Sequence, residues 1–209
     1  MNYLIAILLG YGLGCINPAY LLGILKGFDI RTKGTFNAGA SNAKVTMGWP
    51  AFFIVVAYDI LKAFIAVLLI RYFYPGQEGL AILAGCMAII GHIFPFYLQF
   101  KGGKGFASYI GLVFAVNWKI GIILVVVGLA LSFLANWIVM ATLVFVICFP
   151  IYCILTKAPT ITIVAALAVS LLIIYKHLNN FKKLKRGEEI GINGKPVSFL
   201  FKKESYNIE

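Results

Sequence analysis

Charged side chains are scarce in this chain, and acidic ones are the scarcest. Only 12% of the 209 residues are charged, and Asp and Glu together number 7. A water-soluble domain carries about 25% charged residues, so this chain has too little charge to cover a soluble surface. Hydrophobic residues make up 62% and form apolar runs of about 20 residues, the length that a ~30 Å hydrocarbon core requires of a helix. The composition therefore predicts an integral membrane protein.

Cysteine and histidine are also few, which argues against a metal centre or a disulfide framework. The four cysteines lie in apolar runs, without CxxC or Cys/His spacing, and we interpret them as small buried hydrophobic residues. They are Cys15, Cys86, Cys148 and Cys153. We predict no metal and no cofactor.

The first apolar run is predicted to stay in the membrane as a helix. No basic residue precedes it, and at residues 3–25 it is longer than the apolar core of a signal peptide. Gly14, Asn17 and Pro18 interrupt it, so we expect a break with a functional purpose in this helix.

Polar residues divide the chain into about seven apolar runs, and we predict an all-α polytopic membrane protein with that number of transmembrane helices. The runs span roughly residues 3–25, 50–70, 80–99, 106–117, 119–135, 137–155 and 160–176. The fourth is short and is expected to be tilted or to cross only partly. No internal repeat or soluble domain is evident, so residues 1–209 form one membrane domain with a polar tail at 177–209.

The positive charge predicts the orientation, because short cytoplasmic loops retain Lys and Arg. Fourteen of the 18 Lys and Arg residues lie after the first, third and seventh runs, which a seven-helix topology places on one side. These are Lys26, Arg31, Lys33, Lys44, Lys101, Lys104, Lys176, Lys182, Lys183, Lys185, Arg186, Lys195, Lys202 and Lys203. We therefore expect the N-terminus outside and the C-terminus in the cytoplasm. Anionic lipid explains the net charge of +11 without a nucleic-acid partner.

Three polar segments lie on that cytoplasmic side, and their convergence is the main functional signal. The first, residues 29–42 followed by Lys44, is rich in Gly, Asn, Thr and Ser. A loop of this composition offers backbone N–H groups, hydroxyls and cations that suit an anion. Taken alone, it is equally compatible with an ordinary solvated turn.

The second segment, residues 91–105, ends in Lys-Gly-Gly-Lys-Gly. Glycines around Lys104 allow a ligand to approach the backbone closely, and lysine supplies a point charge for phosphate. The P-loop pattern of nucleotide-binding proteins is absent, because Leu98 and Gly105 stand where it needs glycine and a hydroxyl. We favour a phosphate site over a plain flexible connection.

The third segment, residues 175–189, begins where the last run ends. His177 and Asn180 are three residues apart and share one helical face. The lysines that follow are expected to contact lipid head groups. His92 and His177 are the only two histidines of the chain, and both fall in these segments, which favours a functional role.

Asp59 and Lys62 are ionisable residues inside the second run, three positions apart. Charged groups in the bilayer are costly and are usually paired or functional. We favour a structural pair, with a role in orienting the site as the alternative.

Together these motifs resemble the bacterial glycerol-3-phosphate acyltransferases that use acyl-phosphate, the PlsY family. FDIRTKGTFNAGASN is similar to the first motif of that family, GHIFPFYLQFKGGKG to the second and KHLNNFKKLKRGEE to the third. YDILK, which contains Asp59 and Lys62, also resembles a family element. The resemblance covers nearly the whole chain.

The resemblance implies transfer of a fatty acyl group from acyl-phosphate to the 1-hydroxyl of glycerol 3-phosphate, giving lysophosphatidic acid and phosphate. It implies a bacterial inner-membrane enzyme with a cytoplasmic active site, no cofactor, and a soluble enzyme that supplies acyl-phosphate as a possible partner. The implied catalytic residues are His177, Asn180 and Lys104. The implied substrate-binding residues are Thr35, Asn37, Gly39, Ser41, Asn42, Lys44, His92, Gly102, Gly103 and Gly105.

Several positions depart from the family pattern. Thr35 replaces serine, and Phe36 replaces glycine. Val45 stands where the family has arginine, with Lys44 one residue earlier. Leu178 and Asn179 replace an Arg-Glu pair. A relative with an altered acceptor is therefore an alternative.

Acyl-phosphate carries a good leaving group, so we expect direct attack by the acceptor alcohol without an acyl-enzyme. His177 is the side-chain candidate for the general base, and the phosphate of the donor is the other candidate.

Two alternative functions belong to other classes of membrane protein. An anion transporter fits poorly, because the polar residues gather at one face and no pair of broken helices marks an inverted repeat. An HxxxxD acyltransferase is excluded, because Tyr97 and Lys182 stand five residues after the two histidines.

Overall fold

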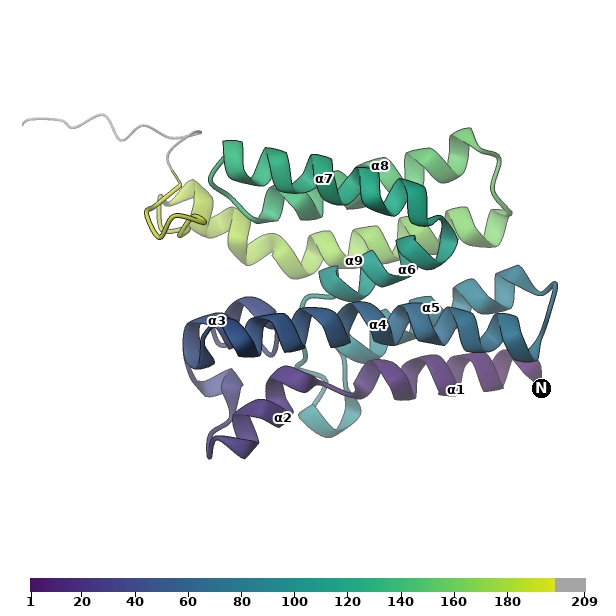
Figure 1. Ribbon diagram of the computed structural model, residues 1–209, viewed down its shortest axis with the longest axis horizontal. Coiled ribbons are helices and arrows are strands. Elements are labelled where there is room, and N and C mark those ends of the chain that lie inside the picture. Colours follow the sequence, from purple (N-terminus) through teal and green to yellow (C-terminus); the bar gives the residue numbers. More distant parts are fainter. Residues whose placement is uncertain (198–209) are drawn as a thin grey trace, which may run out of the picture.

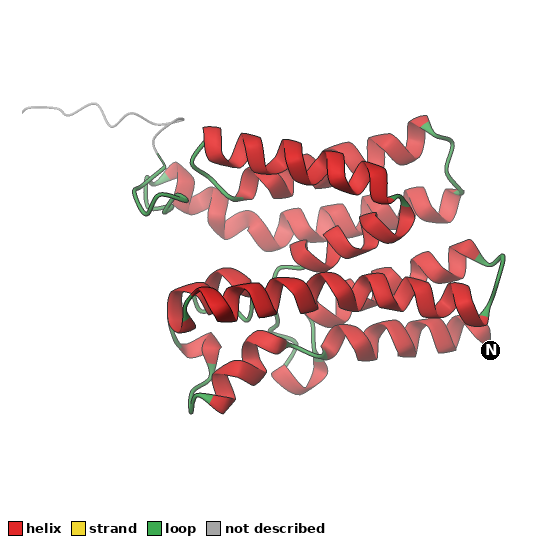
Figure 2. Cartoon of the chain, in the orientation of Figure 1, coloured by secondary structure: helices red, strands yellow, loops and turns green. Residues whose placement is uncertain are grey.

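The computed structural model describes residues 1–197. The predicted tail is therefore covered only to residue 197, and Lys202 and Lys203 lie outside the described residues. Within residues 1–197 the chain is helical, and an isolated antiparallel bridge between Ile190 and Pro196 is its only strand-like pairing. The predicted all-α fold is confirmed (Figure 2).

The helices follow the apolar runs closely. They are α1 (Asn2–Cys15), α2 (Pro18–Leu25), α3 (Ala40–Met47), α4 (Trp49–Phe73), α5 (Glu78–Ile93), α6 (Phe106–Val116), α7 (Trp118–Leu134), α8 (Val139–Leu155) and α9 (Thr160–Lys185), with 3₁₀ helices η1 (Ile30–Thr32) and η2 (Phe96–Leu98). The last helix runs past residue 176, where we had placed the end of the apolar run, so His177 and Asn180 lie on α9 and not in a tail.

Several of these helices can cross a bilayer. Among residues 1–197, four apolar stretches are long enough to span it: Asn2–Leu25, Trp49–Phe73, Glu78–Leu98 and Thr160–Lys185. Three shorter apolar helices, α6, α7 and α8, accompany them. The chain is thus a multi-pass membrane protein in which α6, the shortest of the three, has 11 residues.

The helices form two groups that run along the long axis of the molecule (Figure 1). One contains α1, α4 and α5, and the other contains α7, α8 and α9, while α6 lies between them and packs against α4 and α7. The N-terminus lies at one end of the long axis, and α3 lies with the C-terminal end of α9 at the other end. The polar segments are therefore gathered away from the N-terminus.

Small residues bring α1 and α5 into close contact. A Cβ atom added at Gly10 would lie 2.2 Å from the carbonyl oxygen of Ala84, and one at Gly14 would lie 2.1 Å from that of Ala88. In lipid, helices associate through such close backbone contacts, because apolar side chains gain little by leaving one hydrocarbon for another. This Gly-xxx-Gly face fixes α1 against the helix that leads into the second motif.

The predicted interruption of the first helix lies at Ile16 and Asn17. Both residues have extended backbone conformations, and the Asn17 side chain caps α2 by accepting from the Tyr20 N–H at 2.8 Å. Pro18 occupies the first turn of α2, where its missing N–H costs nothing. The break ends α1 inside the bundle and redirects the chain toward the first motif.

The first polar segment differs from our expectation of a loop, because residues 40–47 form α3. Ser, Asn and Thr favour helix interiors weakly, but Ala43 is buried in a small cluster with Ala19, Ile30 and Val55. Tertiary packing therefore stabilises a helix that local sequence preference does not indicate.

Candidate active site

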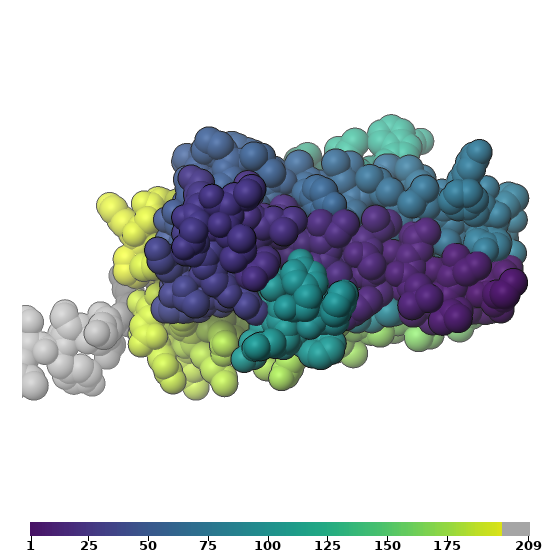
Figure 3. Space-filling view, turned by 90° about the horizontal axis from the view of Figure 1, so that it is seen from below, coloured from purple at the N-terminus to yellow at the C-terminus, as the bar shows by residue number. Residues whose placement is uncertain are grey.

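The three motifs meet at one end of the molecule. Figure 3 shows the purple first motif, the teal second motif and the yellow C-terminal part of α9 as neighbours toward this end. The convergence that we predicted from the sequence is therefore present in the fold.

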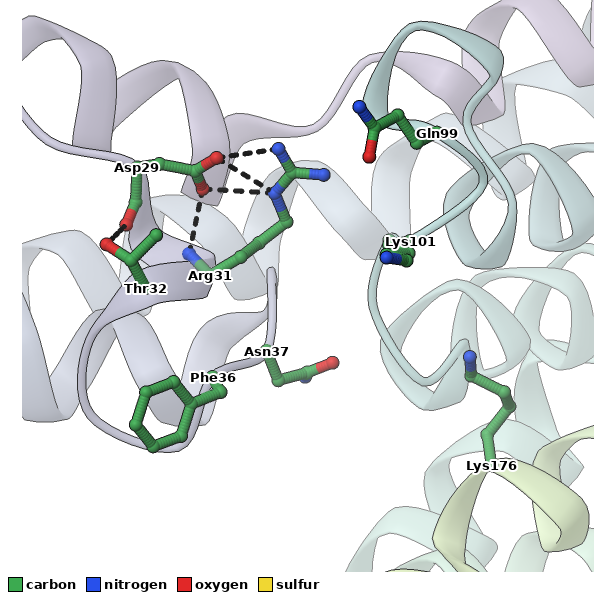
Figure 4. A pocket seen from close by; sticks show the side chains of 9 residues that line it. Asp29, Arg31, Thr32, Phe36, Asn37, Gln99, Lys101 and Lys176 are labelled. Atoms are coloured by element: carbon green, nitrogen blue, oxygen red, sulfur yellow. Dashed lines mark hydrogen bonds and ion pairs between the residues drawn. The ribbon is translucent and has the colours of Figure 1, made fainter.

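An open cavity of about 420 Å³ lies where the motifs meet. It is lined by Asp29, Arg31, Thr32, Phe36, Asn37, Gln99, Lys101, Gly102 and Lys176. In Figure 4 the amide of Asn37 points into the space between the first and second motifs, and Lys176 extends from α9 toward Lys101. Each of the three motifs thus contributes a polar side chain to one cavity.

Asn42 holds the first motif in shape. Its side chain is fully buried. Its Oδ1 accepts from the Thr35 N–H at 2.7 Å, and its Nδ2 lies within donating distance of the carbonyl oxygens of Ile30, Lys33 and Asn37, at 2.8 to 3.0 Å. Asn42 therefore organises the backbone that presents Thr35 and Asn37.

Asp29 and Arg31 connect the first motif to the second. The two side chains form a bidentate ion pair, and this hydrogen bonding from Arg31 lowers the pKa of Asp29. Arg31 also donates to the Leu98 carbonyl oxygen at 2.7 Å. One arginine therefore lines the cavity, neutralises a carboxylate and connects η1 to η2.

The glycines of the second motif fold back on the end of α5. The Gly102 N–H donates to the Ile93 carbonyl oxygen at 3.0 Å, and the Gly103 N–H donates to that of His92 at 3.1 Å. A Cβ atom at either glycine would lie 2.1 Å from an atom of His92. Only glycine fits this return of the chain, and the return places Gly102 on the cavity wall.

Lys104 joins the second motif to the third. Its ammonium group donates to Asn180 Oδ1 at 2.5 Å, and Asn180 Nδ2 donates to Glu189 Oε1 at 2.7 Å. Burial lowers the pKa of Lys104, while the nearby carboxylate of Glu189 opposes that shift. The cation is thus oriented by an amide and lies close to a buried carboxylate.

His177 is held in one tautomer. Its ring is buried, and Nδ1 lies 2.8 Å from the carbonyl oxygen of Ile173, one turn earlier on α9. Because a carbonyl oxygen only accepts, Nδ1 carries a proton, and in the neutral ring Nε2 keeps its lone pair. Lys104 is close enough to act electrostatically on this ring. A ring in this state can accept a proton at Nε2.

The predicted site residues occupy different places in this arrangement. Asn37 and Gly102 line the cavity, while Lys104, His177 and Asn180 form the adjoining cluster. Gly39 caps the N-terminus of α3, and Gly105 begins α6 with a left-handed backbone. Thr35 and Ser41 are exposed on the first motif.

Two of the predicted binding residues point elsewhere. The ammonium group of Lys44 lies 4.0 Å from the centre of the Trp49 ring, and Lys44 is not among the residues that line the cavity. The His92 ring is buried against Asp59 and Lys62. Neither side chain lines the cavity.

Sequence reasoning missed several residues that line the cavity. Arg31, Lys101 and Lys176 supply its cationic groups, and Gln99 adds an amide. All four lie inside the three motifs, but we counted the lysines only toward membrane orientation. Their position in the same motifs as the glycines and Asn37 was the sequence signal that could have identified them as cavity residues. The cavity now combines three cations with one carboxylate, which suits an anionic ligand.

Known proteins share both the sequence and the fold. The family model described as glycerol-3-phosphate acyltransferase matches residues 4–187. Glycerol-3-phosphate acyltransferase 1 of Oceanobacillus iheyensis is 37% identical over 90% of this chain and 94% of its own. The glycerol-3-phosphate acyltransferase of Prochlorococcus marinus is 36% identical over 92% and 98%.

Two crystal structures of PlsY (YgiH), an integral membrane glycerol 3-phosphate acyltransferase, are similar to this chain. The glycerol 3-phosphate form has a TM-score of 0.85 at 28% identity, covering 91% of this chain and 96% of that one. The lysophosphatidic acid form has a TM-score of 0.82 at 27% identity, covering 91% and 95%. Family model, relatives and fold agree, and the motifs that carry the resemblance enclose the cavity: the chain belongs to the PlsY family of glycerol-3-phosphate acyltransferases.

Proposed function

We propose that this acyltransferase takes its acyl group from acyl-phosphate and attaches it to the 1-hydroxyl of glycerol 3-phosphate. The observation that carries the proposal is the cationic cavity built from three motifs beside a histidine with a free Nε2 lone pair. Crystal forms of the similar PlsY with glycerol 3-phosphate and lysophosphatidic acid support the same acceptor and product for this chain. Family membership decides against the transporter alternative.

The reaction needs no covalent enzyme intermediate. The acceptor oxygen forms a bond to the acyl carbon, the bond from that carbon to the phosphate oxygen breaks, and phosphate leaves with the electron pair. The hydroxyl proton goes to Nε2 of His177, or to the departing phosphate. Positioning the two reactants can lower such a barrier by up to about 7–11 kcal/mol.

The charged groups divide between holding phosphate and stabilising the reacting carbonyl. Lys104 offsets charge on the donor phosphate and the developing oxyanion. The glycines beside it act through the fold: the N–H groups of Gly102 and Gly103 bind carbonyl oxygens at the end of α5, and Gly105 precedes α6 with a left-handed backbone. Asn37 and the Thr35 hydroxyl face the acceptor phosphate. Gly39 and Ser41 offer the unpaired N–H groups of the first turn of α3. Asn42 contributes by holding this loop, as its hydrogen bonds indicate.

Asn180 of the third motif completes the arrangement. It orients Lys104 and, with His177, the acceptor hydroxyl. Lys44 stands next to the position of the missing arginine at Val45, but its ammonium group lies over the Trp49 ring and it receives no role in the cavity.

We propose that this site lies on the cytoplasmic side of the bacterial inner membrane. The proposal is supported by the basic residues of the three motifs, because short cytoplasmic loops retain Lys and Arg; with seven crossings it puts the N-terminus outside. Acyl-phosphate is water-labile and amphiphilic, so a soluble enzyme that makes it is the expected partner. Its acyl chain would lie between helices, with the phosphate at the interface.

The direct test mixes the purified protein in detergent or lipid cubic phase with acyl-phosphate and glycerol 3-phosphate. Phosphate release that requires both substrates, with lysophosphatidic acid as product, supports the proposal. Release with another alcohol phosphate but not with glycerol 3-phosphate would identify the altered-acceptor alternative. Transfer from acyl-CoA or acyl carrier protein, and none from acyl-phosphate, would contradict the proposed donor.

A further inference from the structure

Three ionisable side chains lie together inside the helix bundle, and none of them lines the cavity. Asp59 and Lys62 come from α4, and His92 comes from α5; each is at most 3% exposed. The ammonium group of Lys62 lies 2.7 Å from Asp59 Oδ1 and 2.7 Å from His92 Nδ1. His92 Nδ1 is 3.2 Å from the same carboxylate oxygen. We refer to these three residues as the buried charged cluster.

The first connection of the cluster is to the break in the first helix. Carbonyl groups in the last turn of a helix lack intrahelical partners, and a cation near this end is favoured by the helix dipole. Lys62 donates to the Ile16 carbonyl oxygen at 3.2 Å. The next residue, Asn17, is fully buried and donates from Nδ2 to the Ala38 carbonyl oxygen at 3.0 Å. Through this break the cluster reaches the backbone beside Asn37.

The second connection is to the glycine loop. The His92 carbonyl oxygen accepts from the Gly103 N–H, and the His92 Nε2 atom lies 2.1 Å from the position that a Cβ atom of Gly103 would take. Nδ1 of His92 contacts Lys62 and Asp59, and Nε2, the other ring nitrogen, is the atom beside Gly103. The Ala38 carbonyl oxygen borders the same position, 3.0 Å from a Cβ atom built there. The two motifs therefore touch directly above His92.

Burying such charges in a membrane is costly, and an apolar set of similar volume is often at least as stable. Stability alone therefore explains the cluster poorly. We infer that Asp59, Lys62 and His92 position the two backbone segments that form the anion cavity. The cluster holds residues 35–39 through its contact with Ile16, which precedes Asn17. It holds residues 101–105 through the contact of His92 with Gly103. The three residues of the cluster are positioning residues, since none of them lines the cavity. This inference rests on the proposed function only for the identity of the anion.

The first test replaces the ion pair by apolar residues. The double variant Asp59→Leu/Lys62→Met leaves no unpaired charge in the bundle. Its matched control, Arg71→Met/Glu78→Gln, removes an ion pair between the same two helices at the end away from the cavity. We expect binding of glycerol 3-phosphate to weaken about tenfold to a hundredfold in the cluster variant, the scale of a misplacement of about 1 Å. The control should bind like the unaltered protein.

A readout that needs no ligand separates positioning from general destabilisation. Amide hydrogen exchange in detergent should accelerate at residues 101–105 and 35–39 in the cluster variant and stay unchanged there in the control. His92→Gln keeps an acceptor and a donor and should retain most of the binding, while His92→Leu should not. If the double variant does not fold, this His92 pair provides the same comparison.

The inference is overturned if the two loops exchange at the same rate in the cluster variant and the unaltered protein. It is also overturned if the Arg71→Met/Glu78→Gln control shows equal losses. Failure of the proposed function would look different. The unaltered protein would then release no phosphate from acyl-phosphate and glycerol 3-phosphate, while the exchange comparison would still show whether the cluster holds the loops.

Discussion

At the residue scale, the site depends on side chains whose hydrogen-bonding capacity is used within the protein. Asn42 contacts four backbone groups of the first motif, and His177 uses Nδ1 on a carbonyl oxygen. Lys104 is different, because its partners are a neutral amide and a nearby carboxylate rather than a full ion pair. No direct ion pair neutralises its charge, so the ammonium group can still act on an incoming phosphate.

Lys104 should give the enzyme an alkaline limit. Burial lowers its pKa, so its ammonium charge is lost at a lower pH than that of an ordinary lysine. As pH rises, kcat/KM for glycerol 3-phosphate should therefore fall through this lowered pKa. A bound phosphate favours the charged ammonium form of Lys104, so the corresponding alkaline fall in kcat should lie at higher pH than the fall in kcat/KM. Steady-state kinetics across alkaline pH would measure both limbs.

The control is Lys104→Arg, whose guanidinium stays protonated throughout. The alkaline limb should vanish in this variant whatever its absolute rate, whereas a limb that persists unchanged would assign the titration to another group. Lys104→Ala should lose most activity while remaining in the membrane.

Phe36 tests a second residue-scale feature. It has a φ of 58°, a left-handed conformation that costs a side-chain residue about 1–2 kcal/mol, and its side chain is largely exposed. Phe36→Gly relieves this strain. It also raises the conformational entropy of the unfolded chain, which lowers stability by about 0.5–1 kcal/mol. We expect a melting temperature that is unchanged or slightly higher, measured by thermal unfolding in detergent.

Phe96 offers the comparison, since it is also largely exposed but lies in the 3₁₀ helix η2. Phe96→Gly should lower stability by about 1 kcal/mol. Equal losses in the two variants would mean that residue 36 is not strained.

At the scale of elements, the site is positioned by the contact between α1 and α5. Gly10 and Gly14 lie against backbone carbonyl groups of α5, and α5 leads directly into the glycine loop. The sequence predicted this helix and its break at Asn17 from composition. It did not predict α3, because that helix depends on packing that no local pattern encodes. It ended the last apolar run at residue 176, but the helical face expected for His177 and Asn180 agrees with the continuation of α9 to Lys185.

Gly14→Ala should disturb this contact. The new methyl group would lie 2.1 Å from the Ala88 carbonyl oxygen, and overpacking of this kind costs about 1–3 kcal/mol. Thermal unfolding in detergent should show the loss. Gly12→Ala on the same helix, where nothing lies within 4 Å, should leave stability unchanged or slightly raised. A Gly14→Ala variant as stable as Gly12→Ala would contradict the close packing.

At the scale of the whole molecule, the sequence predicted that three distant motifs would meet, and the fold brings them to one end. Composition and spacing were sufficient for that, because a membrane confines polar segments to its two faces. The sequence did not predict the individual contacts, such as the pairing of Lys104 with Asn180 or the burial of His92 beside Lys62. These contacts depend on how α4, α5 and α9 rotate against one another.

The orientation can be tested with single cysteines in a background without the native ones. Lys195→Cys should react with a membrane-impermeant thiol reagent only in inside-out vesicles, and Asn2→Cys only in right-side-out vesicles or intact cells. The reverse pattern would place the basic residues and the cavity outside.

The most direct measurement of the central claim is an experimental structure with glycerol 3-phosphate bound. We predict that its phosphate lies in the cavity between Asn37, the backbone at Gly102 and the ammonium groups of the second and third motifs, with the 1-hydroxyl directed toward His177 Nε2. A ligand bound elsewhere, or one that contacts only a single motif, would contradict the shared site.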